Sequence, residues 1–130
     1  MSIIKVRSPD LSELKTDLKL QIDRAAEIER RKYITSGSGQ AMTYMQKADE
    51  AARYLQASTP EPSNYPLLSA EVGITAPTLI EVATIVQAAY SQWQIIGAGI
   101  EAARLSTKSL IEAAESVDAA RSAAQGVQWP

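Results

Sequence analysis

The feature that most constrains this chain is a helical periodicity that runs for about forty residues, from Thr75 to Ala114. Apolar side chains recur there at steps of three and four residues, the spacing of one face of an α-helix. Glycine costs about 1 kcal/mol relative to alanine inside a helix, so we expect Gly97 and Gly99 to mark a bend or a close helix crossing. The apolar positions are Leu79, Val82, Val86, Ala89, Trp93, Ile96, Ile100, Ala103, Leu110 and Ala114.

A second helical pattern occupies the first quarter of the chain. Ser8 and Pro9 predict an N-cap and a first helical position, and the helix should end near Tyr33 or Ile34. Its apolar face has near-heptad spacing. The residues of that face are Leu11, Leu14, Leu18, Ala25 and Ile28, with Ile22 beside them.

A third pattern comes after the sequence Gly-Ser-Gly at residues 37–39. No lysine follows Gly39, so the phosphate-binding P-loop motif is incomplete. We therefore predict the turn of an αα-hairpin, in which Gly37 has positive φ and Ser38 caps the next helix. The apolar face of that helix comprises Ala41, Tyr44, Met45, Ala48, Ala52 and Leu55, and Lys47, Glu50 and Arg53 fall elsewhere on the helical wheel.

The remaining segments read as connections and a short last helix. Three prolines make residues 58–66 a loop, and residues 67–73 predict one or two helical turns closed by Gly73. Ser116 is a candidate N-cap for the last helix, which Gly126 should end. We expect Val127 and Trp129 to fold back as a hydrophobic plug.

The predicted fold is therefore all-α. It is a single helical domain, residues 1–130, in which a bundle is built on the long αα-hairpin and one long C-terminal helix. Residues 1–8 form a short extended N-terminal arm. Three apolar residues of this arm could add a strand to a neighbouring protein, and they are Ile3, Ile4 and Val6.

Composition excludes several classes of function. The chain has no histidine and no cysteine, which removes the usual ligands of zinc, haem and iron–sulfur sites and the nucleophilic triads. The formal net charge of −2 argues against a general nucleic-acid binder. We predict no catalytic residue, no metal site and no cofactor.

Two weaker signals point to other functions. Glu101, Glu112 and Glu115 lie near one helical face and could in principle form a carboxylate site, although Arg104 and Lys108 on the same face favour a solvated charge network. Residues 82–100 carry no charge and approach the length of a membrane span, but three glutamines interrupt them. We expect this helix to be covered by other helices or by a second subunit.

Three segments of the chain resemble a known family. The runs "RKYITSGSGQAMTYMQKADEAARYL" and "YPLLSAEVGITAPTLIEVATIV" and the closing "VQWP" resemble small α-helical proteins and domains from tail modules of tailed bacteriophages. These accompany tail-fibre, tail-fibre-assembly and baseplate proteins. The resemblance covers about residues 22–130 and includes no catalytic motif.

The resemblance implies a virion protein of the phage tail, made in the bacterial host cytoplasm. Its partners would be other phage tail proteins, and it would occur in several copies or as a homo-oligomer. Two alternatives remain: a tail-fibre assembly chaperone absent from the mature virion, and a membrane-active phage protein using residues 82–100. The residues that we predict to contact partners are Ile3, Ile4, Val6, Tyr90, Trp93 and Trp129.

Overall fold

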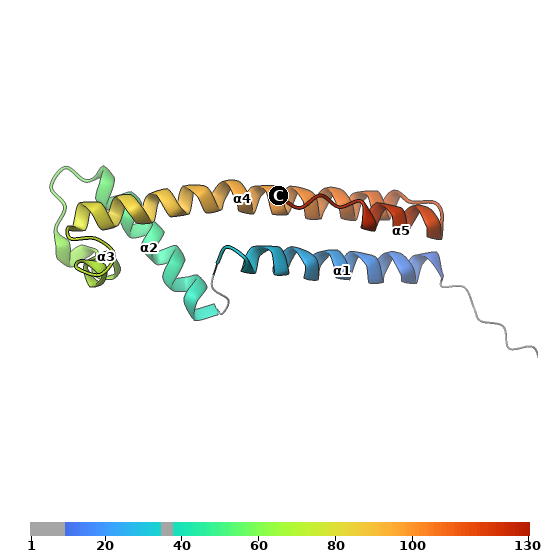
Figure 1. The fold of residues 1–130 in the computed structure, drawn as a ribbon, viewed down its shortest axis with the longest axis horizontal. Coiled ribbons are helices and arrows are strands. Elements are labelled where there is room, and N and C mark those ends of the chain that lie inside the picture. The colour runs from blue at the N-terminus through green and yellow to red at the C-terminus, as the bar shows by residue number, and fades with distance from the viewer. Residues whose placement is uncertain (1–9, 35–37) are drawn as a thin grey trace, which may run out of the picture. The chain divides into compact units, whose positions relative to one another are not determined.

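The computed structural model describes residues 10–34 and 38–130 of the chain (Figure 1). This part of the chain contains five α-helices, a short 3₁₀ helix and no β-strand, which confirms the all-α prediction. The predicted arm, with Ile3, Ile4 and Val6, lies outside the described residues. The α-helices are α1 (Leu11–Arg31), α2 (Ser38–Gln56), α3 (Pro66–Glu71), α4 (Leu79–Ala113) and α5 (Val117–Gln125).

Internal contacts divide the chain into two compact units. The first unit comprises residues 1–32 and 97–130, and the second comprises residues 33–96. Helix α4 contributes its residues up to Ile96 to the second unit and its residues from Gly97 onward to the first. The predicted hairpin turn lies largely outside the described residues, and α1 and α2 belong to different units. The αα-hairpin and the single domain therefore stay predictions.

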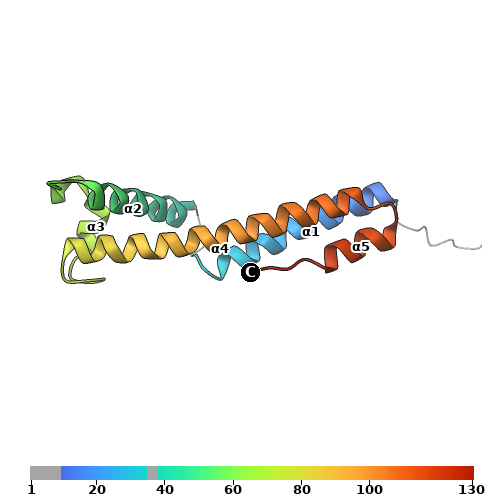
Figure 2. The same cartoon turned by 90° about the horizontal axis from the view of Figure 1, so that it is seen from above.

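The first unit is built from α1, α5 and the second half of α4, which lie side by side in Figures 1 and 2. Its core joins Leu18 and Ile22 of α1 to Ile111 of α4 and Ala120 of α5. The predicted core face of α1 was partly wrong, because Ile28 is 58% exposed and Ala26 is buried in its place. A repeat of about 3.6 residues drifts away from heptad spacing within two or three turns.

Helix α1 also begins and ends differently from the prediction. Its N-cap is Asp10, whose side chain accepts a hydrogen bond from the backbone N–H of Ser12 at 2.9 Å. Ser8 and Pro9 lie outside the described residues. The helix ends at Arg31, before the predicted limit near Tyr33 or Ile34. Arginines in the last turn interact favourably with the negative end of the helix dipole.

The end of the chain completes the first unit as predicted. Ser116 caps α5 by accepting a hydrogen bond from the backbone N–H of Ala119 at 3.1 Å, and α5 ends at Gly126. Val127 and Trp129 pack against the core of this unit. A Cβ atom on Gly99 would lie 3.2 Å from Cγ of Pro130. Gly99 therefore marks the close approach of the C-terminal segment, and α4 continues through it as one helix.

The second unit packs α2 and α3 against the first half of α4. Its core contains Leu68 of α3 and Val82 of α4, both fully buried, together with Ala51 of α2. The loop predicted at 58–66 contains the short 3₁₀ helix, Pro62–Asn64, whose first residue is a proline. Gly73 follows α3 with φ of +86°, as expected for a glycine that ends a helix.

Candidate interaction site on the second unit

Exposed apolar side chains are more numerous on the second unit than on the first. Among the described residues, nine of the thirteen large apolar side chains that are exposed belong to this unit. Scattered exposed apolar residues are normal in proteins, but neighbouring ones that surround a hollow mark an interaction site. The nine are Tyr33, Met42, Met45, Leu55, Val72, Ile74, Ile80, Ile85 and Ile95.

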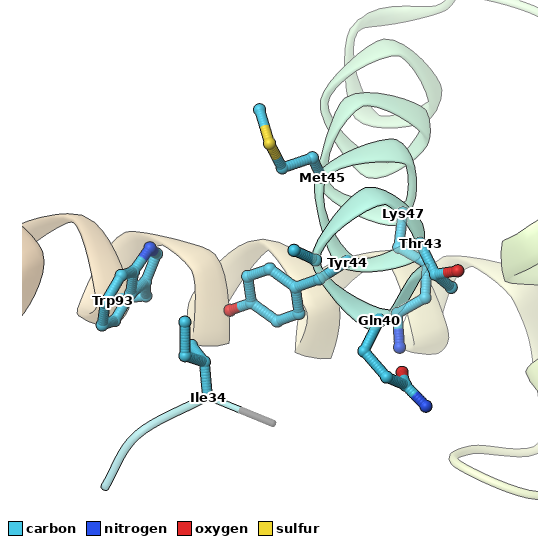
Figure 3. Close-up of a pocket in the computed structure, with 8 residues that line it drawn as sticks. Ile34, Gln40, Thr43, Tyr44, Met45, Lys47 and Trp93 are labelled. Atoms are coloured by element: carbon cyan, nitrogen blue, oxygen red, sulfur yellow. The ribbon is translucent and has the colours of Figure 1, made fainter. Parts of the chain in front are cut away.

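A hollow of about 270 Å³ lies between the start of α2 and the middle of α4. Figure 3 shows Tyr44 reaching from α2 toward Trp93 of α4, with Ile34 beside them. Met45 extends from the same helix and is 67% exposed. The lining is mostly apolar, and its residues are Ile34, Gln40, Ala41, Thr43, Tyr44, Met45, Lys47 and Trp93.

Tyr44 is held at the hollow by an aromatic contact. Its ring centroid lies 6.2 Å from that of Tyr90, and the two rings are tilted by 51°. This separation is within the range in which aromatic pairs attract each other. Partial burial raises the pKa of the Tyr44 hydroxyl, and the nearby charge of Lys47 opposes this only in part.

Lys47 is the charged residue of the lining, and it is anchored to α3. Its Nζ atom lies 2.8 Å from Oε2 of Glu71, whose Oε1 accepts a hydrogen bond from the Thr75 hydroxyl at 2.6 Å. Burial favours a higher pKa for Glu71, but the hydrogen bonds from Lys47 and Thr75 and the lysine charge lower that pKa overall. This ion pair therefore connects α2 to the end of α3 and orients the polar edge of the hollow.

A buried carboxylate fixes α2 to α3 from the core side. Glu50 is 1% exposed, and its Oε1 accepts hydrogen bonds from the backbone N–H groups of Leu67 and Leu68 at 3.0 and 3.3 Å. These amides belong to the first turn of α3, which has no intrahelical acceptor for them. The helical wheel of α2 placed Glu50 away from the core. That prediction was wrong, because the Glu50 carboxylate accepts the hydrogen bonds of the first turn of α3.

The apolar face predicted for α2 is also wrong at its start. Met45 and Ala41 are exposed, whereas Ala48 and Ala51 are buried. Periodicity alone does not determine which arc of a helix meets its neighbours. Met42 and Met45 are 72% and 67% exposed. Two methionines three residues apart were a signal of an interaction surface that the sequence analysis did not use.

The six predicted contact residues have different locations. Tyr90 is half-buried against Tyr44, and Trp93 lines the hollow on the same unit. Trp129 packs against the core of the other unit. The three arm residues are not described. The structure thus places Tyr90 and Trp93 at one site, through Tyr44, and the contacts with partners stay predictions.

Two of the three carboxylates considered for catalysis, Glu101 and Glu112, are paired with cations on the first unit. Glu101 accepts hydrogen bonds from Arg104 at 2.6 Å and from Arg30 at 2.9 Å. Glu112 forms an ion pair with Lys19, and Glu115 is exposed. Hydrogen bonds from Arg104 to Glu101 and from Lys19 to Glu112 lower the pKa of each carboxyl. No group of acidic residues in the described ranges is arranged to hold a metal ion.

Asp23 is the centre of the same charge network. Its Oδ1 accepts hydrogen bonds from Arg104 at 2.9 Å and from Lys108 at 3.0 Å, which joins α1 to the second half of α4. Burial acts to raise the pKa of Asp23, but the two cations together lower it. Within α1, Glu27 and Arg31 form an i,i+4 ion pair at 3.8 Å. These charges connect helices and leave no convergent acid–base pair.

Comparison of this chain with protein-family models, with curated proteins and with solved structures gives no match. Within residues 10–34 and 38–130, no helix has the length and hydropathy required to cross a membrane.

Proposed function

We propose that this chain is a non-enzymatic structural protein of a bacteriophage tail. It would be associated with the tail, the baseplate or the tail fibre, and it would bind other tail proteins through apolar helix faces of its second unit. The proposal has two supports: the hollow at Tyr44 and Trp93, and the resemblance of residues 22–130 to helical proteins of phage tail modules.

The observation that carries the binding role is the composition and size of the hollow. Tyrosine, tryptophan and methionine are the residues enriched at protein interfaces, and here Tyr44, Trp93 and Met45 surround one opening. A volume of about 270 Å³ lies just below the usual range of small-molecule pockets, about 300–1,000 Å³. The hollow is suited to one or two side chains of a partner protein.

Mass spectrometry of purified particles from a phage that encodes this chain tests the proposed role. We expect the chain in the particle, at a constant ratio to other tail proteins. If the chain binds tail-fibre protein before assembly but is missing from particles, it is an assembly chaperone and the structural role is wrong. If neither particles nor assembly intermediates contain it, the tail assignment is wrong.

Paired substitutions test the binding site itself. Met45→Glu places a charge at the hollow, whereas Gln46→Glu places the same charge on the neighbouring exposed position of α2. We expect Met45→Glu and Trp93→Ala to reduce the amount of tail partner that co-purifies at least tenfold. The controls Gln46→Glu and Gln94→Ala should co-purify about as much partner as the unchanged chain. Equal binding by all four variants would exclude the hollow as the contact site.

A further inference from the structure

A second exposed face lies on α4, on the side away from Trp93. Thr84, Ala88, Ser91 and Ile95 follow one another at steps of four, three and four residues, the spacing of a helix–helix seam. All four are exposed, and Ile95 is 76% exposed. Trp93 precedes Ile95 by two residues, or about 200° around the helix, so the hollow and this seam point in different directions.

A groove adjoins one end of the seam. It has a volume of about 470 Å³ and lies where the chain enters α4. The lining residues from α4 are Ile80, Glu81, Thr84 and Ile85, and those from the segment before α4 are Thr75, Ala76 and Pro77. Ile95 follows Thr84 by eleven residues, close to three helical turns, so the protruding side chain and the groove share one side of the helix.

We propose that a second copy of this chain packs antiparallel against this face of α4, with Ile95 of each copy seated in the groove beside Thr84 of the other. The inference rests on the proposed function as an interaction protein and names one of its partners. In the antiparallel arrangement Thr84 lies opposite Ile95 and Ala88 lies opposite Ser91. Each contact therefore occurs twice, as a two-fold axis requires.

The sizes of the side chains are compatible with this pairing. Alanine and serine in the two central layers allow the backbones to approach closely, and the larger isoleucines fill the grooves at the two ends. The Thr84 hydroxyl already donates a hydrogen bond to the Ile80 carbonyl at 2.8 Å, so burying it leaves no donor without an acceptor.

The charges favour a second copy in this orientation. No charged residue occurs from Val82 to Ile100, so the seam offers nothing to complement a charged partner and leaves no charge unpaired when it is covered. A parallel pair would bring the two Glu81 carboxylates to the same end. The antiparallel pair separates them by about 25 Å, since about seventeen residues at about 1.5 Å each lie between their layers.

Analytical ultracentrifugation of the full chain tests the pairing. The seam is short for a stable interface, so we expect a reversible dimer with a dissociation constant on the order of micromolar. Ala88 and Ala89 are neighbouring exposed alanines, and only Ala88 is on the seam. Ala88→Glu should weaken dimerisation at least tenfold, while Ala89→Glu should leave it unchanged. Ser91→Glu repeats the test at a second seam position, and circular dichroism checks that each variant is folded.

Cysteine cross-linking tests the orientation, because the chain contains no cysteine of its own. A mixture of Ala88→Cys and Ser91→Cys proteins should form a mixed disulfide dimer faster than either protein alone. Faster cross-linking of each variant with itself would indicate a parallel pair and overturn the proposal, as would a chain that remains monomeric at high concentration.

The two proposals fail separately. A monomeric chain that is nevertheless present in phage particles would overturn the dimer and leave the tail role intact. If the chain dimerises with the predicted pattern of variants but is absent from every tail complex, the dimer stands and the tail role is wrong.

Discussion

The Oε1 atom of Glu50 accepts a hydrogen bond from the backbone N–H of Leu67 at 3.0 Å, so a side chain of α2 caps the first turn of α3. The contact links residues seventeen positions apart, inside the core of the second unit. A six-residue helix such as α3 is too short to be stable alone. The position of α3 against α2 therefore depends on this carboxylate.

We expect Glu50→Ala to destabilise the chain by about 1–3 kcal/mol, because it leaves buried amides without an acceptor. Glu50→Gln keeps an acceptor oxygen and should cost less. Chemical denaturation followed by circular dichroism measures both. Gln46→Ala, one turn earlier on the exposed side of α2, is the control and should change stability by less than about 0.5 kcal/mol. Equal effects at positions 46 and 50 would contradict the capping role.

The same substitution at two glycines should have opposite effects. Gly73 has φ of +86°, which costs an L-residue about 1–2 kcal/mol, so Gly73→Ala should lower the melting temperature. Gly39 lies within α2, and a Cβ atom there would meet no atom within 4 Å. Gly39→Ala should therefore raise stability by up to about 1 kcal/mol. Thermal unfolding of both variants and the unchanged chain gives the two changes in melting temperature. Changes of the same sign would be inconsistent with the structure.

The ion pairs of Asp23 predict a loss of stability in acid. Its pKa is lowered in the folded chain, so the unfolded chain binds the proton first as the pH falls. The contribution of Asp23 is present above about pH 4, the ordinary pKa of an aspartate, and disappears as the pH falls through the lower folded value. Because the carboxylate is partly exposed, we expect at most about 1 kcal/mol.

Asp23→Asn should therefore reduce stability at pH 7 and bring little further change at pH 2. Urea unfolding at several pH values measures the difference. Asp17→Asn, an exposed position on the same helix, is the control. If the gap between the unchanged chain and Asp23→Asn were as wide at pH 2 as at pH 7, the ion pairs would not be its cause.

The contact between Gly99 and Pro130 predicts a change at Trp129. A leucine at position 99 would displace the Pro130 ring, since even a Cβ atom would lie 3.2 Å from it. In a Trp93→Phe background, where Trp129 is the remaining tryptophan, Gly99→Leu should shift its fluorescence to the red and increase quenching by acrylamide. Ala98→Leu, on an exposed position, should do neither. A blue shift or an unchanged spectrum in Gly99→Leu would refute the contact.

Local signals predicted much of the helical structure. Ser116 and Gly126 were predictable because each bonds a backbone group that the ends of α5 leave unpaired. Gly73 was predictable because the chain leaves α3 through a positive φ, which glycine adopts without strain. Asp10 and Ser8 are both good caps, and a short segment alone does not distinguish them. The sequence therefore predicted the presence of α1 better than its first residue.

Which side of a helix is buried was harder to predict, because that depends on its neighbours. Glu50 looked like a surface residue, yet it is buried against amides of a helix that begins sixteen residues later. Met45 looked like a core residue and lines an exposed hollow. Of that site, Trp93 and Tyr90 were predicted as contacts, whereas Ile34 and Lys47 were found only from the structure.

The division of the chain has a consequence for the order of folding. Residues 33–96 are continuous in sequence, so the second unit can form while the ribosome is still adding residues 97–130. The first unit joins residues before position 33 to residues after position 96, and it must close a loop of that whole length. If the intervening segment has already folded, its ends are held and this closure costs less entropy. Folding of the second unit would then speed folding of the first. A substitution in the core of the second unit, such as Leu68→Ala, would also slow the folding of the first unit, to which Leu68 does not belong.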